Sequence, residues 1–433
     1  MIARYSLPEA EKIWTRQRRF DLMKDVEVAL CEAWCRLGEI PMDALKVIKE
    51  KMTFTIERVD ELERITDHDV VAFVNALGES VPEQSCYIHK GATSSDILDT
   101  ASSMQIVEAG KLILAELDKL IETMKQKAVQ FKHTPEMGRT HGIHAEPITF
   151  GLKLLSFYQE LKRDRLRLEQ AIAANKVGKM SGAVGTYANL HPDLEQIVCD
   201  ILGLEPDPVA TQVISRDRHA QYMLALAQLG ATIERIGTQF RTLQRTEIGE
   251  VEEAFKAGQT GSSAMPHKKN PKTSEQLCGL ARILRANALV ALENVALWDE
   301  RDISHSSVER MILPDSSILA AYMVRKMAYI TSNLVVNTDR MAKNIEMTGG
   351  AIFSGRLLVA LMSRGVGRDQ AYGIIQRLAI PASKGGTPLK DACIGDMEVR
   401  KILDEGDLNA IFDTSFYLRY IDDIFIRSLE ENK

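Results

Sequence analysis

Apolar residues recur at steps of three and four positions through most of this chain, the spacing that places side chains on one face of a helix. In the clearest stretch, residues 217–247, apolar positions follow one another at alternating steps of three and four: Leu226, Leu229, Ile233, Ile236, Phe240 and Leu243. This seven-residue period predicts one helix of about 46 Å. Similar patterns predict long helices at 94–132, 147–176, 271–302 and 306–345, the last bent or interrupted at Pro314.

Helices of this length carry more apolar surface than a compact monomer of 433 residues can bury. An elongated bundle, completed by other copies of the chain, would cover those faces. The sequence therefore predicts an all-α fold with a central long-helix bundle that assembles with other subunits.

Changes in pattern divide the chain into three predicted domains. Residues 1–93 contain shorter, loop-rich units and end in a Lys-Gly-Ala-Thr turn. The long-helix bundle is expected at 94–346, with a glycine-rich irregular insertion at 178–193. A Thr-Gly-Gly sequence then opens a C-terminal helical domain, 347–433.

Composition narrows the class of protein. An apolar content of 45% supports a large core, and the net charge of −6 disfavours binding to nucleic acid or to an anionic membrane. No apolar run approaches the roughly twenty residues of a membrane span, and the N-terminal residues lack the apolar core of a signal peptide. The six cysteines are scattered, and Cys31 and Cys35 are expected to be core residues rather than metal ligands. These features predict a cytoplasmic protein.

The most informative stretch is a polar loop at 258–271, Gly-Gln-Thr-Gly-Ser-Ser-Ala-Met-Pro-His-Lys-Lys-Asn-Pro. Its glycines permit backbone conformations that other residues avoid, and its prolines exclude regular helix on either side. The serines, histidine, lysines and asparagine offer a base, cations and amide donors. Loops of this kind often close over substrate and expel water, whereas a simple linker would seldom concentrate this chemistry.

Two histidines stand before predicted helix starts. His68 lies in a Thr-Asp-His-Asp sequence, and His89 precedes Lys-Gly-Ala-Thr-Ser-Ser-Asp. Thr93 or Ser94 can cap the following helix, with Asp96 three residues beyond Thr93 as in a capping box. Because the free amide hydrogens of a helix start also bind anions, capping alone and ligand binding both remain open.

A third histidine, His141, lies in Gly-Arg-Thr-His-Gly-Ile-His, just ahead of a long predicted helix. His141 and His144 have the spacing of two metal ligands, but the local sequence specifies no third ligand. Proton exchange near neutral pH is the simpler role for such a histidine. Glu275 begins the helix that follows the polar loop, and it is a candidate to orient or polarise such a histidine.

Residues 301–310, Arg-Asp-Ile-Ser-His-Ser-Ser-Val-Glu-Arg, join two long predicted helices. Arginine binds phosphate and carboxylate through paired hydrogen bonds, so Arg301, Arg310 and the serines suit an anionic ligand. A solvated, ion-paired turn is the alternative. Because the chain is acidic, an anionic substrate would need cations gathered at one place, and Arg4 and Lys268 are further candidates.

From Gly261 to Pro271 the loop resembles the GSSxMPxKxNP motif of the fumarase/aspartase superfamily, whose members eliminate fumarate or a fumarate-like acid. His267 is similar to the residue found in adenylosuccinate lyases and carboxymuconate cycloisomerases. The whole chain resembles the bacterial adenylosuccinate lyase family in its Arg-Tyr-Ser opening, in the histidine, Thr-Ser-Ser-Asp and arginine motifs above, and in the tail Phe-Asp-Thr-Ser-Phe-Tyr-Leu. Lys269 stands where that family often has arginine.

This resemblance implies a three-domain fumarase/aspartase-like fold and a carbon–nitrogen lyase of purine nucleotide biosynthesis. The family cleaves adenylosuccinate to AMP and fumarate, and SAICAR to AICAR and fumarate. Such chemistry needs no metal and no other cofactor. The resemblance also implies a homotetramer in which three subunits contribute to each site.

The resemblance further implies roles for individual residues. His141 would protonate the leaving nitrogen with support from Glu275, and Ser262 would be the base. Lys268 and Asn270 would stabilise the carbanion formed next to a carboxylate. The remaining residues implied to contact substrate are Arg4, Tyr5, Asp67, His68, Asp69, His89, Thr93, Ser94, Gln212, Ser263, Lys269, Gln276, Arg301, Ser306, Ser307 and Arg310.

Residue chemistry alone favours a different base. A serine hydroxyl is a very weak base in water, so His68 or His89 would be chosen from residue type. Ser262 fits the role only if loop closure surrounds its oxygen with amide hydrogens and cations.

Two rival functions remain open at this stage. The first is another fumarate-releasing lyase or a cycloisomerase of the superfamily, which an assay with adenylosuccinate would distinguish. The second is an inactive structural protein on the same fold, because a fold does not guarantee a function. The presence of His141, Ser262, Lys268 and Glu275 argues against the second.

Overall fold

The computed structural model describes residues 1–255, 258 and 264–430 of the chain. These residues are mainly helical, and their strands are confined to three two-stranded sheets. The all-α class predicted from the sequence is therefore confirmed. The chain forms two compact units, of which the first contains residues 1–119, 163–234 and 277–326, and the second contains residues 120–162, 235–276 and 327–433.

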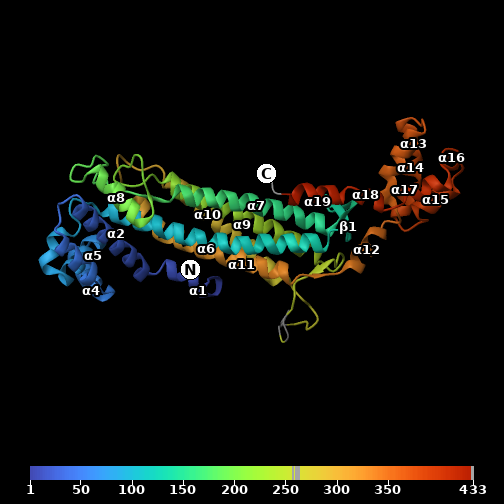
Figure 1. The fold of residues 1–433 in the computed structure, drawn as a ribbon. Helices are drawn as coiled ribbons and strands as arrows, with labels where there is room; N and C mark the ends of the chain where they lie inside the picture. The colour runs from blue at the N-terminus through green and yellow to red at the C-terminus, as the bar shows by residue number, and fades with distance from the viewer. Residues whose placement is uncertain (256–257, 259–263, 431–433) are drawn as a thin grey trace. The chain divides into compact units, whose positions relative to one another are not determined.

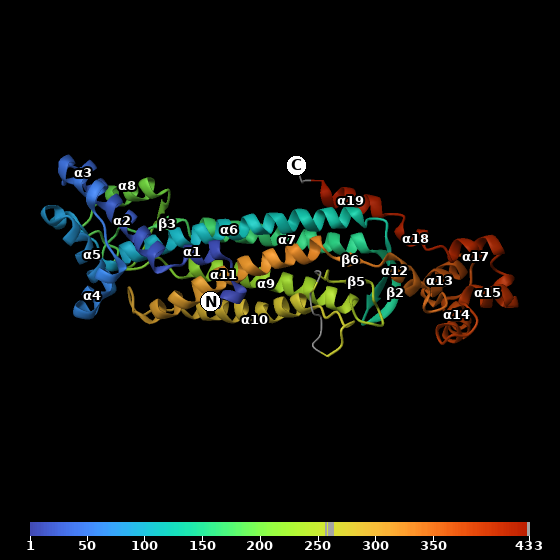
Figure 2. The same cartoon turned by 90° about the horizontal axis from the view of Figure 1, so that it is seen from below.

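Mostly short helices form the N-terminal part of the first unit (Figures 1 and 2). They are η1 (Ala3–Tyr5), α1 (Pro8–Ile13), α2 (Arg16–Arg36), α3 (Met42–Lys51), α4 (Ile56–Thr66), α5 (Asp69–Ser80) and η2 (Pro82–Tyr87). The rings of Phe20, Phe54 and Phe73 pack together in the hydrophobic core of these helices, and the ring centroids of Phe20 and Phe73 are 5.1 Å apart. Helix α8 (Pro192–Leu202) packs against α2 and adds Leu194 to this core.

Five long helices contribute residues to both units: α6 (Ser94–Gln130), α7 (Phe150–Ala174), α9 (Asp217–Leu243), α10 (Lys272–Glu293) and α11 (Ser304–Ser332). Their segments within the first unit run side by side in both views (Figures 1 and 2). The six apolar positions that predicted α9 are all buried. The period of three and four residues therefore identified the packed face of this helix correctly.

All five predicted long helices end before the predicted residue: α6, α7 and α9 by two to four residues, and the other two by more. Helix α10 ends at Glu293 rather than 302, and Trp298 beyond it is exposed. The stretch predicted at 306–345 is divided into α11 and α12 (Thr338–Glu346) by the strand β6 (Val335–Val336), while α11 continues through Pro314. The side chain of Asn337 caps α12 by accepting the N–H of Arg340, which explains the new start.

The strands were not predicted. In the second unit β1 (Pro135–Thr140) and β2 (Ile143–Thr149) form an antiparallel hairpin, and β5 (Val251–Glu252) pairs with β6. In the first unit β3 (Val177–Gly178) pairs in parallel with β4 (Glu205–Pro206). The hairpin corrects the expectation that His141 simply precedes a helix, because it places His141 at a turn between two strands.

The second unit contains the remaining short helices: η3 (Ala351–Phe353), α13 (Ser354–Ser363), α14 (Arg368–Ser383), α15 (Leu389–Gly395), α16 (Met397–Arg400), α17 (Glu405–Ile411), α18 (Ser415–Leu418) and α19 (Ile421–Leu429). Leu357, Leu361 and Leu389 lie in one buried cluster there, and Met137 of the hairpin lies in another with Ile345. Helices α13 to α17 gather together in Figure 1.

The three-domain division at 93 and 346 stays a prediction, and it coincides with the start of α6 at Ser94 and the end of α12 at Glu346. Among the described residues no single helix is both long and apolar enough to cross a membrane. One bent pair, Thr338–Glu346 with Ala351–Ser363, meets the length and composition of a span only when taken together.

Candidate active site

His141 occupies the tip of the β1–β2 hairpin in the second unit. Thr140 pairs with Ile143, so His141 and Gly142 form a two-residue turn, with φ of 56° and 79°. Positive φ at both positions is typical of the type I′ turn that suits the twist of a hairpin. Histidine is among the few residues that tolerate this region, and its ring is exposed at the tip. The fold thus presents His141 to its surroundings on a short, regular support.

Near its tip the hairpin is held by an ion pair to a buried carboxylate. Arg139 donates two hydrogen bonds to the carboxylate of Glu250, at 2.8 and 3.0 Å, and Glu250 is fully buried. The amide of Asn344 donates to the same carboxylate at 2.7 Å. Gly138 allows the strands to approach, since a Cβ there would lie 2.4 Å from the carbonyl oxygen of Glu146. These contacts fix the hairpin two residues from His141.

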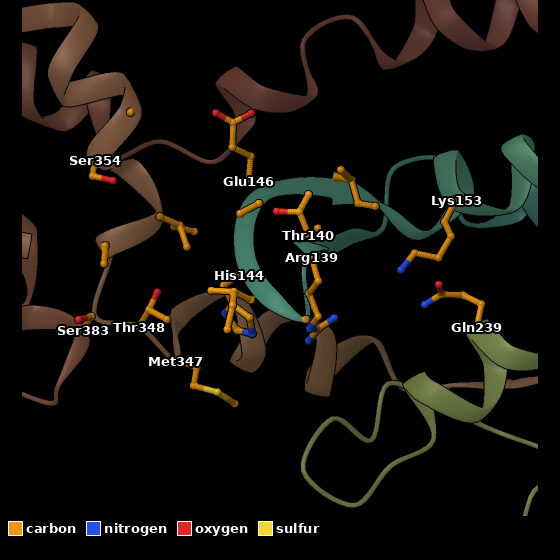
Figure 3. A pocket seen from close by; sticks show the side chains of 18 residues that line it. Arg139, Thr140, His144, Glu146, Lys153, Gln239, Met347, Thr348, Ser354 and Ser383 are labelled. Atoms are coloured by element: carbon orange, nitrogen blue, oxygen red, sulfur yellow. The ribbon is translucent and has the colours of Figure 1, made fainter. Parts of the chain in front are cut away.

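A cleft of about 1100 Å³ lies against the hairpin within the second unit (Figure 3). Arg139, Thr140 and His144 line it from the hairpin, and Met347 and Thr348 line it from the segment after α12. Burial, together with the nearby charge of Arg139, lowers the pKa of His144, so this imidazole is neutral near pH 7. The cleft therefore adjoins His141, the proposed acid, and is lined by a second histidine, His144.

A second buried carboxylate lies at the start of the hairpin. Glu136 is fully buried and accepts a hydrogen bond from Lys153, which lines the cleft. Burial raises the pKa of Glu136 to about 7, with a further contribution from the charge of Glu250, although Lys153 opposes the shift. This group did not stand out in the sequence, because its environment is created by residues distant along the chain.

The described part of the polar loop also lies in the second unit. Lys268 is exposed, and Lys269 forms an ion pair with Glu252 at 2.6 Å. Glu275 lies in the first turn of α10 and is exposed, with Gln276 beside it. Asn270 is half-buried just before the helix. Ser262 and Ser263, predicted as base and substrate contact, lie outside the described residues.

A second cleft, of about 220 Å³, lies in the first unit and is rich in cations. Its arginines are Arg16, Arg19, Arg216, Arg301 and Arg310. Ser306 and His305 also line it, and the predicted residues Arg301, Ser306 and Arg310 are thus brought together. The buried Nε of Arg301 has no hydrogen-bond partner in the described part of the chain. Asp99 and Glu309 also line the cleft and pair with Arg216, so the other arginines are the ones that suit a phosphate or carboxylate.

Asp69 balances part of this charge. Its carboxylate accepts a hydrogen bond from Arg310 at 2.6 Å and lies 3.6 Å from a guanidinium nitrogen of Arg19. Burial would raise the pKa of Asp69, but the hydrogen bond and charge of Arg310, with the charge of Arg19, lower it. Arg19 was missed from the sequence because it lies inside α2, where an arginine gives no local signal.

Thr93 and Ser94 lie at the start of α6, where the half of the predicted capping box that Asp96 supplies is present. The carboxylate of Asp96 accepts the N–H of Thr93 at 2.8 Å. Its other oxygen accepts hydrogen bonds from Lys179 and from the N–H groups of Ser181 and Gly182. Asp96 and Lys179 are both fully buried. A buried charge pair therefore holds the helix start that carries Thr93.

The other predicted contacts of the first unit are dispersed around these groups. Gln212 accepts a hydrogen bond from Arg301 at 3.0 Å, and Tyr5 packs edge-on against Tyr322. His68 is exposed and caps α5 through its ring nitrogen. The remaining predicted residues of this unit are Arg4, Asp67 and Ser307, all exposed, and His89, which is bonded to Glu27.

Three of the predicted site residues share an unusual backbone conformation. Asp67, His89 and His141 have φ of 51°, 59° and 56°. Positive φ is uncommon outside glycine, and strained residues cluster at functional sites. No cluster of three or more His, Cys, Asp or Glu side chains within the described ranges is arranged to hold a metal ion.

Comparisons with known proteins agree with these motifs. A family model described as lyase matches residues 3–284, and one described as adenylosuccinate lyase C-terminus matches residues 350–428. The chain is 46% identical to adenylosuccinate lyase of Thermotoga maritima, over 100% of both chains, and 46% identical to that of Bacillus subtilis, over 99% of both.

Solved structures give the same picture at lower identity. A fumarate lyase from Mesorhizobium sp. BNC1 has a TM-score of 0.90 at 27% identity, covering 99% of each chain. The 3-carboxy-cis,cis-muconate lactonizing enzyme from Pseudomonas putida has a TM-score of 0.89 at 28% identity, covering 98% of this chain and 96% of the other. Over its full length the chain is more similar in sequence to the adenylosuccinate lyases than to these solved structures. The chain belongs to the adenylosuccinate lyase family.

Proposed function

We propose that this enzyme cleaves adenylosuccinate to AMP and fumarate, and SAICAR to AICAR and fumarate. The observation that carries the proposal is full-length identity of 46% to adenylosuccinate lyases, together with His141 at the tip of a braced hairpin. Both substrates combine a phosphate with two carboxylates. The cation-rich cleft of the first unit suits these anionic groups.

The reaction breaks a carbon–nitrogen bond after a proton is removed from the adjacent carbon. The proposed base is Ser262, which takes the proton and leaves a carbanion delocalised into the neighbouring carboxylate. Lys268 and Asn270 stabilise this added negative charge, the kind of electrostatic contribution that is usually largest in catalysis. The electron pair then forms the double bond of fumarate as the bond to nitrogen breaks.

His141 protonates the departing nitrogen, so that AMP leaves with a neutral amino group and AICAR with a neutral carboxamide. Glu275 supports the imidazole in its proton-donating form. An imidazole suits this task because it exchanges protons near neutral pH. The left-handed turn places His141 at the tip of the hairpin, where it is exposed.

Substrate binding is proposed for the residues implied by the family motifs. The nucleotide would contact Arg4, Tyr5, Asp67, His68, Asp69, His89, Ser306, Ser307 and Arg310. The succinyl group and the intermediate would be surrounded by Thr93, Ser94, Gln212, Ser263, Lys268, Asn270 and Arg301, with Lys269 and Gln276 as further contacts. The ion pair between Asp69 and Arg310 keeps one such cation oriented before substrate arrives.

The proposal extends to assembly and location. We propose a cytoplasmic homotetramer with sites shared between subunits, without nucleic acid or membrane partners. Exposed apolar side chains on α10 support further packing, among them Ile283 at 47% and Leu289 at 61% exposure. Such side chains are unusual along one helix of a free monomer.

The proposal is tested by incubating the purified protein with adenylosuccinate and, separately, with SAICAR while fumarate release is followed. Turnover of both, with no added metal and after exhaustive chelation, is the expected result. Argininosuccinate serves as the matched control substrate, because it releases fumarate in a related family. Turnover of argininosuccinate alone, or activity that returns only with a metal, would contradict the proposal.

A further inference from the structure

Residues 244–253 lead from the end of α9 into β5, entirely within the second unit. We infer that Gln244, Glu250 and Glu253 are positioning residues for the elimination reaction. These three residues lie on one short segment of chain and contact both the His141 hairpin and the residues that lead into α10. The inference rests on the proposed function, because it concerns the same catalytic groups.

Glu253 fixes the start of α10. Its carboxylate accepts the N–H of Ser274 at 2.7 Å and of Thr273 at 3.2 Å, as well as the hydroxyl of Ser274. The residue before this helix is Pro271, which has no side-chain oxygen, so the free amides of the first turn need an acceptor from elsewhere. A buried carboxylate twenty residues earlier in the chain satisfies them.

Gln244 links both sides of the same junction. Its side-chain oxygen accepts the N–H of Glu253 at 3.0 Å, and its side-chain nitrogen donates to the carbonyl of Lys269, also at 3.0 Å. Residues 252 and 269 are joined again by the ion pair between Glu252 and Lys269. The chain between Lys268 and Glu275 is thus tied to residues 244–253 at Lys269, Thr273 and Ser274.

Glu250 ties the same segment to the hairpin. It is bonded through Arg139 to a strand that ends one residue before His141, and through Asn344 to α12. Breaking a buried charge pair leaves an uncompensated charge, so Glu250 and Arg139 form a rigid connection. Within ten residues of chain, one segment therefore contacts both the hairpin that carries His141 and the stretch that carries Lys268 and Glu275.

The effect of this arrangement is on geometry more than on affinity. Lys268 and Glu275 are exposed, so their placement depends on how firmly their backbone is held. A displacement of about 1 Å at a catalytic group costs on the order of 10²-fold in rate. Loss of the contacts from Glu253 or Gln244 is therefore expected to lower kcat while leaving KM nearly unchanged.

The test compares Glu253→Ala and Gln244→Ala with Asp404→Ala in the full-length protein. Asp404 is a matched control, because its carboxylate caps α17 in the same unit through a capping box, away from the proposed catalytic residues. Each variant is assayed for kcat and KM with adenylosuccinate, and its melting temperature is measured. Glu253→Gln is included because its amide oxygen can still accept one of the helix amides.

The expected result is a fall in kcat of about tenfold to 10²-fold for Glu253→Ala and Gln244→Ala, with KM within about threefold of the original. Glu253→Gln should recover part of the loss. Asp404→Ala should lose comparable thermal stability and keep kcat within about twofold. If Glu253→Ala and Gln244→Ala are folded and behave like Asp404→Ala, the inference is overturned. Failure of the unmodified protein to cleave adenylosuccinate would instead refute the proposed function.

Discussion

The ring of His89 lies 2.7 Å, from Nδ1 to Oε1, from the buried carboxylate of Glu27. The second oxygen of Glu27 accepts the backbone N–H of His89 at 3.0 Å. Burial alone would lower the pKa of His89, but the hydrogen bond and charge of Glu27, together with the charge of Asp96, raise it. The pair favours a protonated imidazole beside the start of α6, where an anionic substrate is proposed to bind.

Replacing Glu27 with Gln should lower the pKa of His89 and change how stability depends on pH. Because the folded pKa lies above the unfolded value of about 6.5, the stabilisation is fully present below that pH and is lost as pH rises through the folded pKa. The melting temperature of the variant should therefore fall furthest below the original at acid pH. A deficit that stays constant from about pH 5 to about pH 9 would show that the pair carries no titrating charge.

His141→Ala should reduce turnover of adenylosuccinate by roughly 10²–10⁴-fold, the range expected for loss of a general acid. Substrate binding should change little, because the side chain is exposed at a turn, and the melting temperature should fall only by the strain that alanine adds at a positive φ. His133→Ala is the control, since His133 is also an exposed histidine of the second unit. Near-normal turnover in His141→Ala would remove this residue from the acid role.

Ser262→Ala should abolish turnover while the protein remains folded, because the change removes a single oxygen. His68→Ala should act mainly on KM, as expected for a substrate contact. Steady-state kinetics of the two variants decide between the possible bases. An inactive His68→Ala variant together with an active Ser262→Ala variant would indicate that a histidine, and not Ser262, is the base.

Mixing two inactive variants tests the shared site. If His141 and Ser262 of one site belong to different chains, dissociating and reassociating His141→Ala with Ser262→Ala subunits should restore some sites with both residues intact. The measurement is fumarate release by the mixed sample, with native mass spectrometry to show that hybrid oligomers formed. Hybrids that stay at background activity would refute the model for this pair.

The sequence predicted the long helices well, because the side chains that define them lie within a few residues of one another. The spacing of Leu226, Leu229 and Ile233 alone indicates a buried helix face, and all three are buried. The hairpin was missed because His141 and Gly142 form a turn that is weak as a local signal, and because its strands contain Gly138 and Pro147 and lack a regular alternation of apolar and polar residues. Strand pairing and helix ends depend on packing that a local pattern does not contain.

The candidate site was predicted only where motifs are contiguous. Arg301, Ser306 and Arg310 lie close in sequence and share one cleft. Arg19 and Glu250 act on partners far along the chain, Asp69 and Arg139, and an isolated arginine or glutamate gives no indication of such a partner. Long-range ion pairs are therefore the part of this site that only the fold reveals.

The left-handed turn at the hairpin tip has a consequence for chemical rescue. At a φ of 56° an alanine strains the backbone, whereas glycine adopts this conformation freely. His141→Gly should thus keep the tip intact and leave an opening the size of the lost ring. Added imidazole should restore more turnover to His141→Gly than to His141→Ala, so that a small diffusible molecule replaces the missing proton donor on an undistorted support.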